Sequence, residues 1–187
     1  MIVFRCLAWD RAASPTSRGG PLWFPRMLQG NGRHDNPDLY GCLYMSVEPV
    51  SAVSEQIQRL AGTSLEAADL VRRGLPLALA TIDFDDRGEI VDLDEPKVLV
   101  GEKMRPSQVA TNDRSITQAG ASEIFMRHPE AAGIRWWSTI EALWPNVTIF
   151  DRAGDLLAVE DVHPLELGDG IVVEAAEYLG LPIPDLT

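Results

Sequence analysis

The sequence has few of the side chains that build metal and cofactor sites. It contains two cysteines and three histidines in 187 residues, and no HExxH or CxxC arrangement. Two cysteines form no disulfide framework, and isolated histidines form no zinc site, so no metal is expected. The patterns GxGxxG, GxxxxGK and GxSxG are also absent, which leaves Rossmann, P-loop and α/β-hydrolase interpretations without support. Cys6 and Cys42 stand in apolar contexts, and we expect both to be buried free thiols in strands.

Long apolar runs and positive charge are also scarce. No segment approaches eighteen apolar residues, and the apolar run at the N-terminus is short for a secretory signal, so a cytoplasmic protein with no membrane contact is expected. The chain has 16 Lys and Arg against 28 Asp and Glu, a net charge of −12. This balance argues against direct nucleic-acid binding. The acidic net charge is compatible with a local basic pocket that binds an anion, and with a protein partner that has a basic surface.

One acidic group deserves weighing as a cation site, because Asp83, Asp85 and Asp86 lie close together. Carboxylate oxygens are ligands for hard cations, but these residues fall in a turn-like stretch before Gly88. A solvated hairpin tip is the favoured interpretation.

The composition, 45% hydrophobic and 24% charged, is that of a globular protein, and the length predicts a single domain over residues 1–187. Short apolar runs predict strands at residues 2–9, 41–46, 75–84, 89–93, 97–100, 134–137, 146–150 and 156–160. Helices are expected after an N-cap at Ser46, over 64–73, over 115–128 with Ser115 as cap, after Ser138, and over 171–179. Strands interrupted by irregularly placed helices favour an α+β fold over a regular βαβ repeat.

Three polar residues of different chemistry, Arg33, Tyr44 and Glu55, follow one another at intervals of eleven positions. On the expected helix, Glu55 falls almost opposite the apolar stripe that begins at Val50. That position suits an ordinary solvated glutamate and equally suits a glutamate that faces a cleft.

Two arginines are candidates for binding an anion. Arg33 follows a turn, where its guanidinium could fork onto a phosphate or carboxylate, or could lie on the surface paired with Asp35 or Asp38. Arg5 lies within an apolar strand, where an unpaired charge is costly. It either points outward or faces a cleft that holds an anion.

Tyr44 and Ser138 also have structural alternatives. Tyr44, between two apolar residues of an expected strand, could be a core or edge tyrosine. Ser138 ends the strand that carries Trp136 and Trp137, and a helix N-cap is a strong alternative to a functional role. The two tryptophans point to opposite faces, so one is expected in the core and the other beside a cleft.

Taken together, these residues resemble the RES domain, the toxin half of bacterial Xre–RES toxin–antitoxin systems, and the resemblance covers most of the chain. This chain has Phe4 where tyrosine is frequent in the family, and His34 where an aromatic residue is frequent. The segments that carry the resemblance are Phe4-Arg5, Gly32-Arg33, Leu43 to Ser46, the helix with Glu55, Gly133 to Ser138, and Phe150-Asp151.

The resemblance implies a fold similar to ADP-ribosyltransferases, with a split β-sheet core and flanking helices. It implies cleavage of the bond between nicotinamide and ribose in NAD, which is a substrate here, by hydrolysis or by phosphorolysis. Glu55 would stabilise the oxocarbenium-like ribose, and Arg5 and Arg33 would hold the pyrophosphate or an incoming inorganic phosphate. Tyr44 would contact the nicotinamide ribose, and Ser138 would help to order the site.

The resemblance also implies a partner, an Xre-type antitoxin that neutralises the toxin by plugging the NAD cleft. Two alternatives stay open at this point. The chain could transfer ADP-ribose to a protein, or it could be a non-catalytic binding module on the same fold. The oligomeric state, including a homo-oligomer, is also open.

Overall fold

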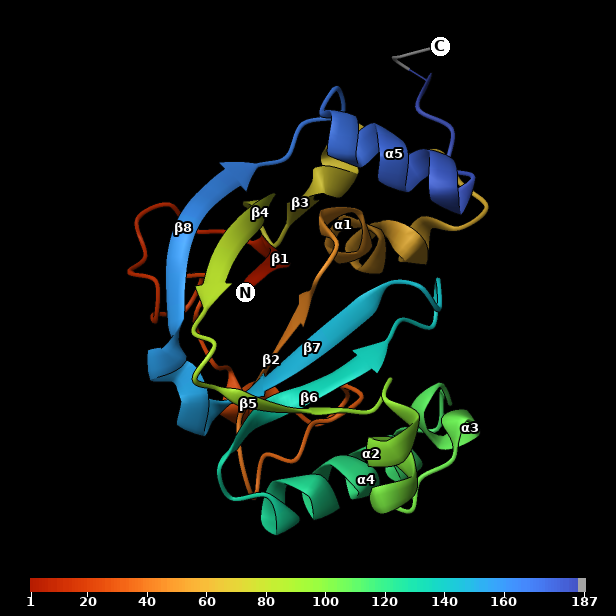
Figure 1. Ribbon diagram of the computed structural model, residues 1–187. Helices are drawn as coiled ribbons and strands as arrows, with labels where there is room; N and C mark the ends of the chain where they lie inside the picture. Colours follow the sequence, from red (N-terminus) through yellow and green to blue (C-terminus); the bar gives the residue numbers. More distant parts are fainter. Residues whose placement is uncertain (185–187) are drawn as a thin grey trace. The chain divides into compact units, whose positions relative to one another are not determined.

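The computed structural model describes residues 1–184, which form two compact units (Figure 1). Each unit is built from segments that are separated in the sequence. Unit 1 contains Met1, Phe24–Met45 and Phe84–Ala158. Unit 2 contains Ile2–Trp23, Ser46–Asp83 and the described residues from Val159 onward.

The strands of unit 1 follow the order β2-β7-β6-β5. β6 pairs with β7 antiparallel and with β5 parallel, so the pairing is mixed. Gly133 in β6 allows the close approach of β7, because a Cβ there would lie 2.2 Å from the carbonyl oxygen of Thr148. The four strands are β2 (Cys42–Ser46, of which Ser46 belongs to unit 2), β5 (Glu89–Asp92), β6 (Ala131–Trp137) and β7 (Pro145–Phe150).

Helices α2, α3 and α4 lie together on one side of β5 and β6 in Figure 1. Between the helices and the strands lies a core in which the rings of Tyr40, Phe125 and Phe150 meet, with centroids 4.5 to 5.0 Å apart. The helical elements of the unit are η1 (Arg26–Leu28), α2 (Pro96–Gly101), α3 (Pro106–Val109), α4 (Arg114–Arg127) and η4 (Asp151–Leu156).

In unit 2, β4 pairs antiparallel with β1 along most of its length, and β3 and β8 also pair with β4. Its strands are β1 (Ile2–Ala8), β3 (Val71–Arg72), β4 (Leu75–Phe84) and β8 (Leu157–Pro164); Phe84 and the first two residues of β8 belong to unit 1. Its helical elements are α1 (Pro49–Ile57), η2 (Gln58–Leu60), η3 (Ala67–Leu70) and α5 (Gly170–Leu179).

Helix α1 is buried on more than one face, because it packs against both β1 and α5 (Figure 1). Val50, Val53 and Ile57 form the expected apolar stripe, but Ser51 and Ser54 are also buried. Burial of α1 therefore extends beyond the apolar stripe. Small serines suit a helix that is enclosed on two sides, since they allow neighbouring backbones to approach.

The α+β prediction is confirmed, because the described residues contain eight strands with mixed pairing and flanking helices. One expected strand is wrong, since residues 97–100 belong to helix α2. Pro96 at its first position suits a helix start, and of its apolar residues only Leu99 is buried. A short run of β-branched and apolar residues does not distinguish a strand from one helical turn.

Two helix starts also differ from expectation. Ser46 is the last residue of β2, where it pairs with Phe4, and the N-cap position of α1 is Glu48, before Pro49. A residue before proline favours the extended backbone that Glu48 adopts. At α4 the cap is Asp113, whose carboxylate accepts a hydrogen bond from the backbone N–H of Ser115 at 2.9 Å.

Two expected helices are absent from their predicted positions within residues 1–184. Residues 64–73 form the short 3-10 helix η3 followed by β3. Residues 138–144 form a turn that joins β6 to β7. Both segments are short, so their periodicity carried little information.

The expectation for the two cysteines is met. Cys6 in β1 and Cys42 in β2 are free and buried, and burial raises the pKa of the Cys6 thiol to about 12. None of the helices in the described chain combines the length and the apolar character needed to cross a membrane. A single domain over residues 1–187 stays a prediction.

Candidate active site

Arg33 is the centre of a buried polar cluster in unit 1. Its side chain is 5% exposed, so the interpretation as a surface arginine is wrong. The guanidinium nitrogen Nη1 donates to the carbonyl oxygens of Val109 at 2.9 Å and Thr111 at 2.6 Å. The guanidinium carbon lies 4.8 Å from the ring centroid of Trp136, a cation–π arrangement. These contacts hold the guanidinium in one place.

The backbone around Arg33 is fixed by helix α4. The hydroxyl of Thr117 donates to the carbonyl oxygen of Arg33 at 2.6 Å. The side-chain amide of Gln118 donates to the carbonyl oxygens of Gly30 at 3.1 Å and Gly32 at 2.9 Å. The turn that precedes Arg33 is thus bound to a rigid element.

Asp35 is a second buried member of the cluster. One carboxylate oxygen accepts hydrogen bonds from the backbone N–H groups of Gly30 at 2.8 Å and Gly32 at 2.7 Å. The other accepts from the Tyr44 hydroxyl at 2.7 Å and lies 3.5 Å from the Cys42 thiol. Burial raises the pKa of Asp35, but these donors outweigh burial and the net pKa lies below its ordinary value. Asp35 is therefore ionised at neutral pH.

Gly32 leaves space for the bond between Asp35 and Tyr44. A Cβ at this position would lie 2.5 Å from both the carboxylate oxygen and the phenol oxygen. Any side chain here would push the two groups apart. Glycine is therefore required for steric reasons at the position before Arg33.

Tyr44 connects the Arg33 turn to strand β2. Its hydroxyl donates to Asp35 and accepts from the backbone N–H of His34 at 2.8 Å. Burial raises the pKa of the phenol, and the nearby Cys42 and Asp35 raise it further, so the phenol stays protonated. The hydroxyl donates its one proton to Asp35, and the half-buried ring packs against the core of unit 1.

His34 is buried between aromatic rings. Its Nδ1 lies 2.9 Å from the Thr148 hydroxyl oxygen, which also accepts a hydrogen bond from the indole N–H of Trp136 at 3.1 Å. Burial lowers the pKa of His34 to about 3, and the charge of Arg33 adds to this effect. The imidazole is therefore neutral at physiological pH.

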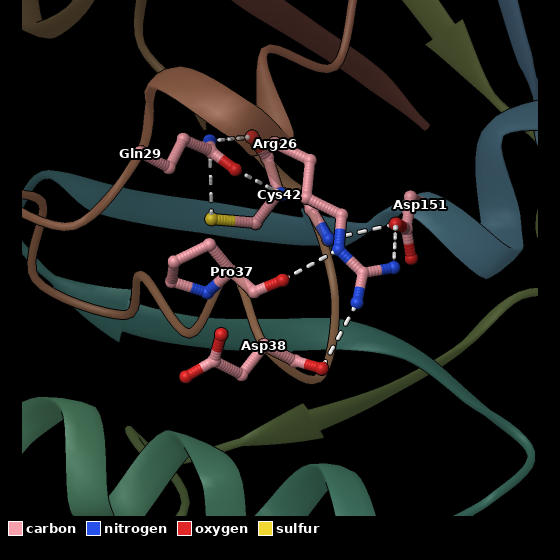
Figure 2. Close-up of polar contacts among 7 residues, drawn as sticks. Arg26, Gln29, Pro37, Asp38, Cys42 and Asp151 are labelled. Carbon is pink, nitrogen blue, oxygen red and sulfur yellow. Dashed lines mark hydrogen bonds and ion pairs between the residues drawn. The ribbon is translucent and has the colours of Figure 1, made fainter.

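A set of polar contacts holds the part of the loop that follows Arg33 and leads to β2 (Figure 2). The carboxylate of Asp151 accepts from the backbone N–H of Gly41 at 2.7 Å and lies 3.7 Å from the guanidinium of Arg26. Arg26 also donates to the carbonyl oxygens of Pro37 at 2.7 Å and Asp38 at 3.1 Å. Asp151 thus fixes η1 and the loop after Arg33 to the end of β7.

Gln29 pairs with the start of β2 in the same view (Figure 2). Its amide nitrogen donates to the carbonyl oxygen of Cys42 at 2.6 Å, and its amide oxygen accepts from the Cys42 N–H at 3.1 Å. This reciprocal pair lies just before the Gly30 turn. The loop is therefore anchored on both sides of Arg33.

Ser138 begins the turn between β6 and β7 and is 2% exposed. Its hydroxyl oxygen accepts a hydrogen bond from the backbone N–H of Ile140 at 3.1 Å. The residue thus caps a turn instead of a helix. Trp136 before it is in the core and Trp137 is half-buried, as the alternation in a strand predicts.

The remaining two predicted site residues belong to unit 2. Arg5 in β1 is half-buried and donates to the carbonyl oxygen of Pro21 at 2.5 Å. Glu55 in α1 is half-buried, and one carboxylate oxygen accepts from the side chain of Gln58 at 2.8 Å. The sequence therefore placed Glu55 correctly on a helix at an accessible position.

Unit 1 brings Arg33 and Tyr44 together through Asp35 and His34, although no contact between Arg33 and Tyr44 themselves is needed for this link. The sequence interpretation considered Asp35 only as a partner for a surface arginine. The signal that could have identified it is the Gly30-x-Gly32 turn, whose exposed N–H groups need an acceptor.

The acidic turn shows no arrangement for a cation. Asp85 pairs with Arg87, whose guanidinium donates to the carboxylate at 2.6 Å and 2.8 Å. Among residues 1–184 no group of three or more His, Cys, Asp or Glu side chains is placed to hold a metal ion.

Unit 1 of this α+β protein thus contains a buried guanidinium held in a fixed position, in a loop that the ionised Asp35 closes. The family model of the RES domain matches residues 3–168 of the 187-residue chain. The chain therefore belongs to the RES domain family, which is associated with NAD-related enzymatic activity. No curated protein matches the chain.

Proposed function

We propose that this protein is an NAD-consuming toxin that cleaves the bond between nicotinamide and ribose. In the reaction, the bond from the nicotinamide nitrogen to the ribose C1 breaks, and its electron pair stays with nicotinamide. An oxygen of water or of inorganic phosphate then bonds to C1. With water the products are ADP-ribose, nicotinamide and a proton. With phosphate the products are nicotinamide and ADP-ribose that carries the phosphate on the same ribose C1.

The observation that carries this proposal is the buried, fixed guanidinium of Arg33 in a chain of the RES family. A guanidinium held by two carbonyl oxygens and one indole ring loses little conformational freedom when an anion binds. Such a group suits the pyrophosphate of NAD, which is a bidentate anionic target. In unit 2, Arg5 would contribute a second positive charge for the phosphates.

The role of Glu55 in the proposal is electrostatic. When nicotinamide leaves, the ribose carries positive charge that it does not have in the ground state. A carboxylate near that charge stabilises the transition state more than bound NAD, which lowers the barrier. The ring of Tyr44 would contact the nicotinamide ribose, and Ser138 would order the turn after β6.

The test is nicotinamide release from NAD by the purified protein, compared with its Glu55→Gln variant. We expect release by the wild-type protein, and a loss of at least about 100-fold in Glu55→Gln, because preorganised charge is a large catalytic term. The matched control is Glu174→Gln, which changes the same charge at an exposed position of α5 in the same unit. It should retain full activity.

The same assay with and without inorganic phosphate identifies the acceptor. A requirement for phosphate would establish phosphorolysis, and release without phosphate would establish hydrolysis. Full activity of Glu55→Gln would contradict the role of this carboxylate. No release from folded protein would favour transfer of ADP-ribose to a protein absent from the assay, or a binding module.

The family also supports a partner for this toxin. We propose that an Xre-type antitoxin binds the protein in the cytoplasm and blocks access to NAD, with the acidic toxin matched to a basic-surfaced partner. Co-expression with a small helix-turn-helix protein encoded next to this chain would restore growth of cells that the toxin arrests. Growth that stays arrested would count against that partner.

A further inference from the structure

We propose that Asp35 is the positioning residue of the Arg33 site: its ionised carboxylate sets where the guanidinium lies. This inference rests on the proposed function, in which Arg33 binds the phosphates of NAD. Asp35 itself is 5% exposed and acts through the backbone and through Tyr44, not on the substrate.

The first argument is local. Asp35 bonds to the N–H groups of residues three and five positions before it, Gly32 and Gly30. These bonds close the segment 30–35 into a tight loop, and Arg33 lies inside that loop. When the loop is closed, the directions in which the Arg33 side chain can leave the backbone are few.

The second argument is the connection to the sheet. Tyr44 in β2 donates to Asp35 and accepts from the N–H of His34, so its hydroxyl bonds to residues on both sides of the His34–Asp35 peptide. The loop is thereby bound to β2 at two points, immediately after Arg33. The Tyr44 phenol thus holds the loop that carries Arg33 at a fixed place beside the rigid strand β2.

The third argument is the charge. Hydrogen-bond donors from Gly30, Gly32 and Tyr44 converge on the carboxylate, and the Cys42 thiol is a weaker fourth. In a protonated acid or an amide, one of the two acceptor oxygens is replaced by a group that carries hydrogen, which would face the hydrogens of these donors. The ionised form alone satisfies all of them, and a buried donor left without an acceptor is costly. The chemistry of this site therefore needs aspartate and not asparagine.

The experiment measures NAD binding by calorimetry in the Glu55→Gln background, so that no substrate is consumed. We expect Asp35→Asn to raise the Kd for NAD at least 10-fold. The matched control is Asp38→Asn. Asp38 is exposed and lies three positions after Asp35, so this variant removes the same charge from a surface side chain. It should change the Kd less than twofold. Equal effects of the two variants would overturn the proposal, since bulk charge would then explain both.

A crystal structure of Asp35→Asn provides a readout that does not depend on NAD. The proposal expects the Arg33 guanidinium to move away from the carbonyl oxygens of Val109 and Thr111. A guanidinium that stays in place overturns the positioning role, whatever happens to affinity. If wild-type protein binds no NAD, the proposed function fails, and this structure still decides the role of Asp35.

A milder variant covers the case in which Asp35→Asn does not fold. Tyr44→Phe removes one donor and the link to β2 while it keeps the ionised Asp35. We expect an intermediate rise in the Kd for NAD and a smaller displacement of Arg33. An unchanged Kd together with an unchanged Arg33 in Tyr44→Phe would overturn the transmission through the phenol.

Discussion

The guanidinium of Arg33 lies over the indole ring of Trp136, with its central carbon 4.8 Å from the ring centroid. Arg33 comes from a loop and Trp136 from β6, so one contact joins the loop to a strand within unit 1. The indole N–H also donates to the Thr148 hydroxyl of β7. The ring therefore supports the arginine from a position that two strands define.

Two replacements of Trp136 should distinguish the contribution of the ring face to NAD binding from that of the indole N–H. Trp136→Leu removes the cation–π contact, which contributes about 1–2 kcal/mol when desolvated, so the Kd for NAD should rise about 5- to 30-fold. Trp136→Phe keeps an aromatic face and should have a smaller effect on the Kd. Calorimetric titration of both variants checks this. Equal effects of the two variants would mean that the indole N–H, which both lack, is what matters, and not the ring face.

His34 should make the stability of the fold sensitive to acid. Its pKa is about 3 in the folded protein, against about 6.5 in an unfolded chain. As pH falls below about 6.5, the unfolded chain binds a proton that the folded protein excludes, so the free energy of unfolding falls by roughly 1.4 kcal/mol per pH unit. Urea unfolding at pH 7 and pH 5 measures this fall in the wild-type protein and in His34→Phe, where it should be smaller.

The control for this measurement is His163→Gln, because His163 is exposed beside Asp169. It should keep the wild-type difference between the two pH values. If His34→Phe also kept that difference, buried His34 would not be the group that excludes the proton.

Asp151 should be needed to hold the loop that follows Arg33. Asp151→Ala leaves the buried N–H of Gly41 without its acceptor and removes the ion pair with Arg26, so we expect a loss of about 1–3 kcal/mol in the free energy of unfolding. The comparison is Asp155→Ala, which removes an exposed carboxylate four positions later. Equal melting temperatures of the two variants would show that the contacts in Figure 2 contribute little.

Ser138→Ala should act first on stability. The hydroxyl oxygen caps the turn by accepting from the Ile140 N–H, and the residue is 2% exposed, so its loss should cost about 1 kcal/mol. Thermal unfolding and NAD cleavage measured on the same sample separate the two roles. A wild-type melting temperature together with lost cleavage would place the hydroxyl in the chemistry.

The sequence predicted the strands of the fold better than the helix ends. The long apolar strands, such as Leu75–Phe84, carry a pattern that tertiary contacts do not alter. The run at 97–100 is too short to carry such a pattern, because a few consecutive residues of this kind fit a strand or one turn of helix equally well. The start of α4 was displaced because Asp113 and Ser115 are both good caps, and only the backbone decides between them.

In the candidate site, residue type and spacing pointed to Arg33 and Tyr44, but not to what lies between them. The sequence could not show that Arg33 is buried, since an arginine after a turn is usually solvated. Nor could it show that the Tyr44 hydroxyl accepts from the backbone N–H of His34, because that contact joins residues ten positions apart. The assignments of Glu55, Arg5 and Ser138 to the chemistry stay predictions.

The enclosure of α1 has a consequence for how the protein is made. The helix that carries Glu55 packs against α5, and residues 170–179 leave the ribosome long after α1 has been synthesised. Until then, the buried serines and apolar side chains of α1 lack one of their two neighbours. The surroundings of Glu55 are therefore complete only after α5 has been synthesised, and a product truncated before Gly170 would lack this side of the helix.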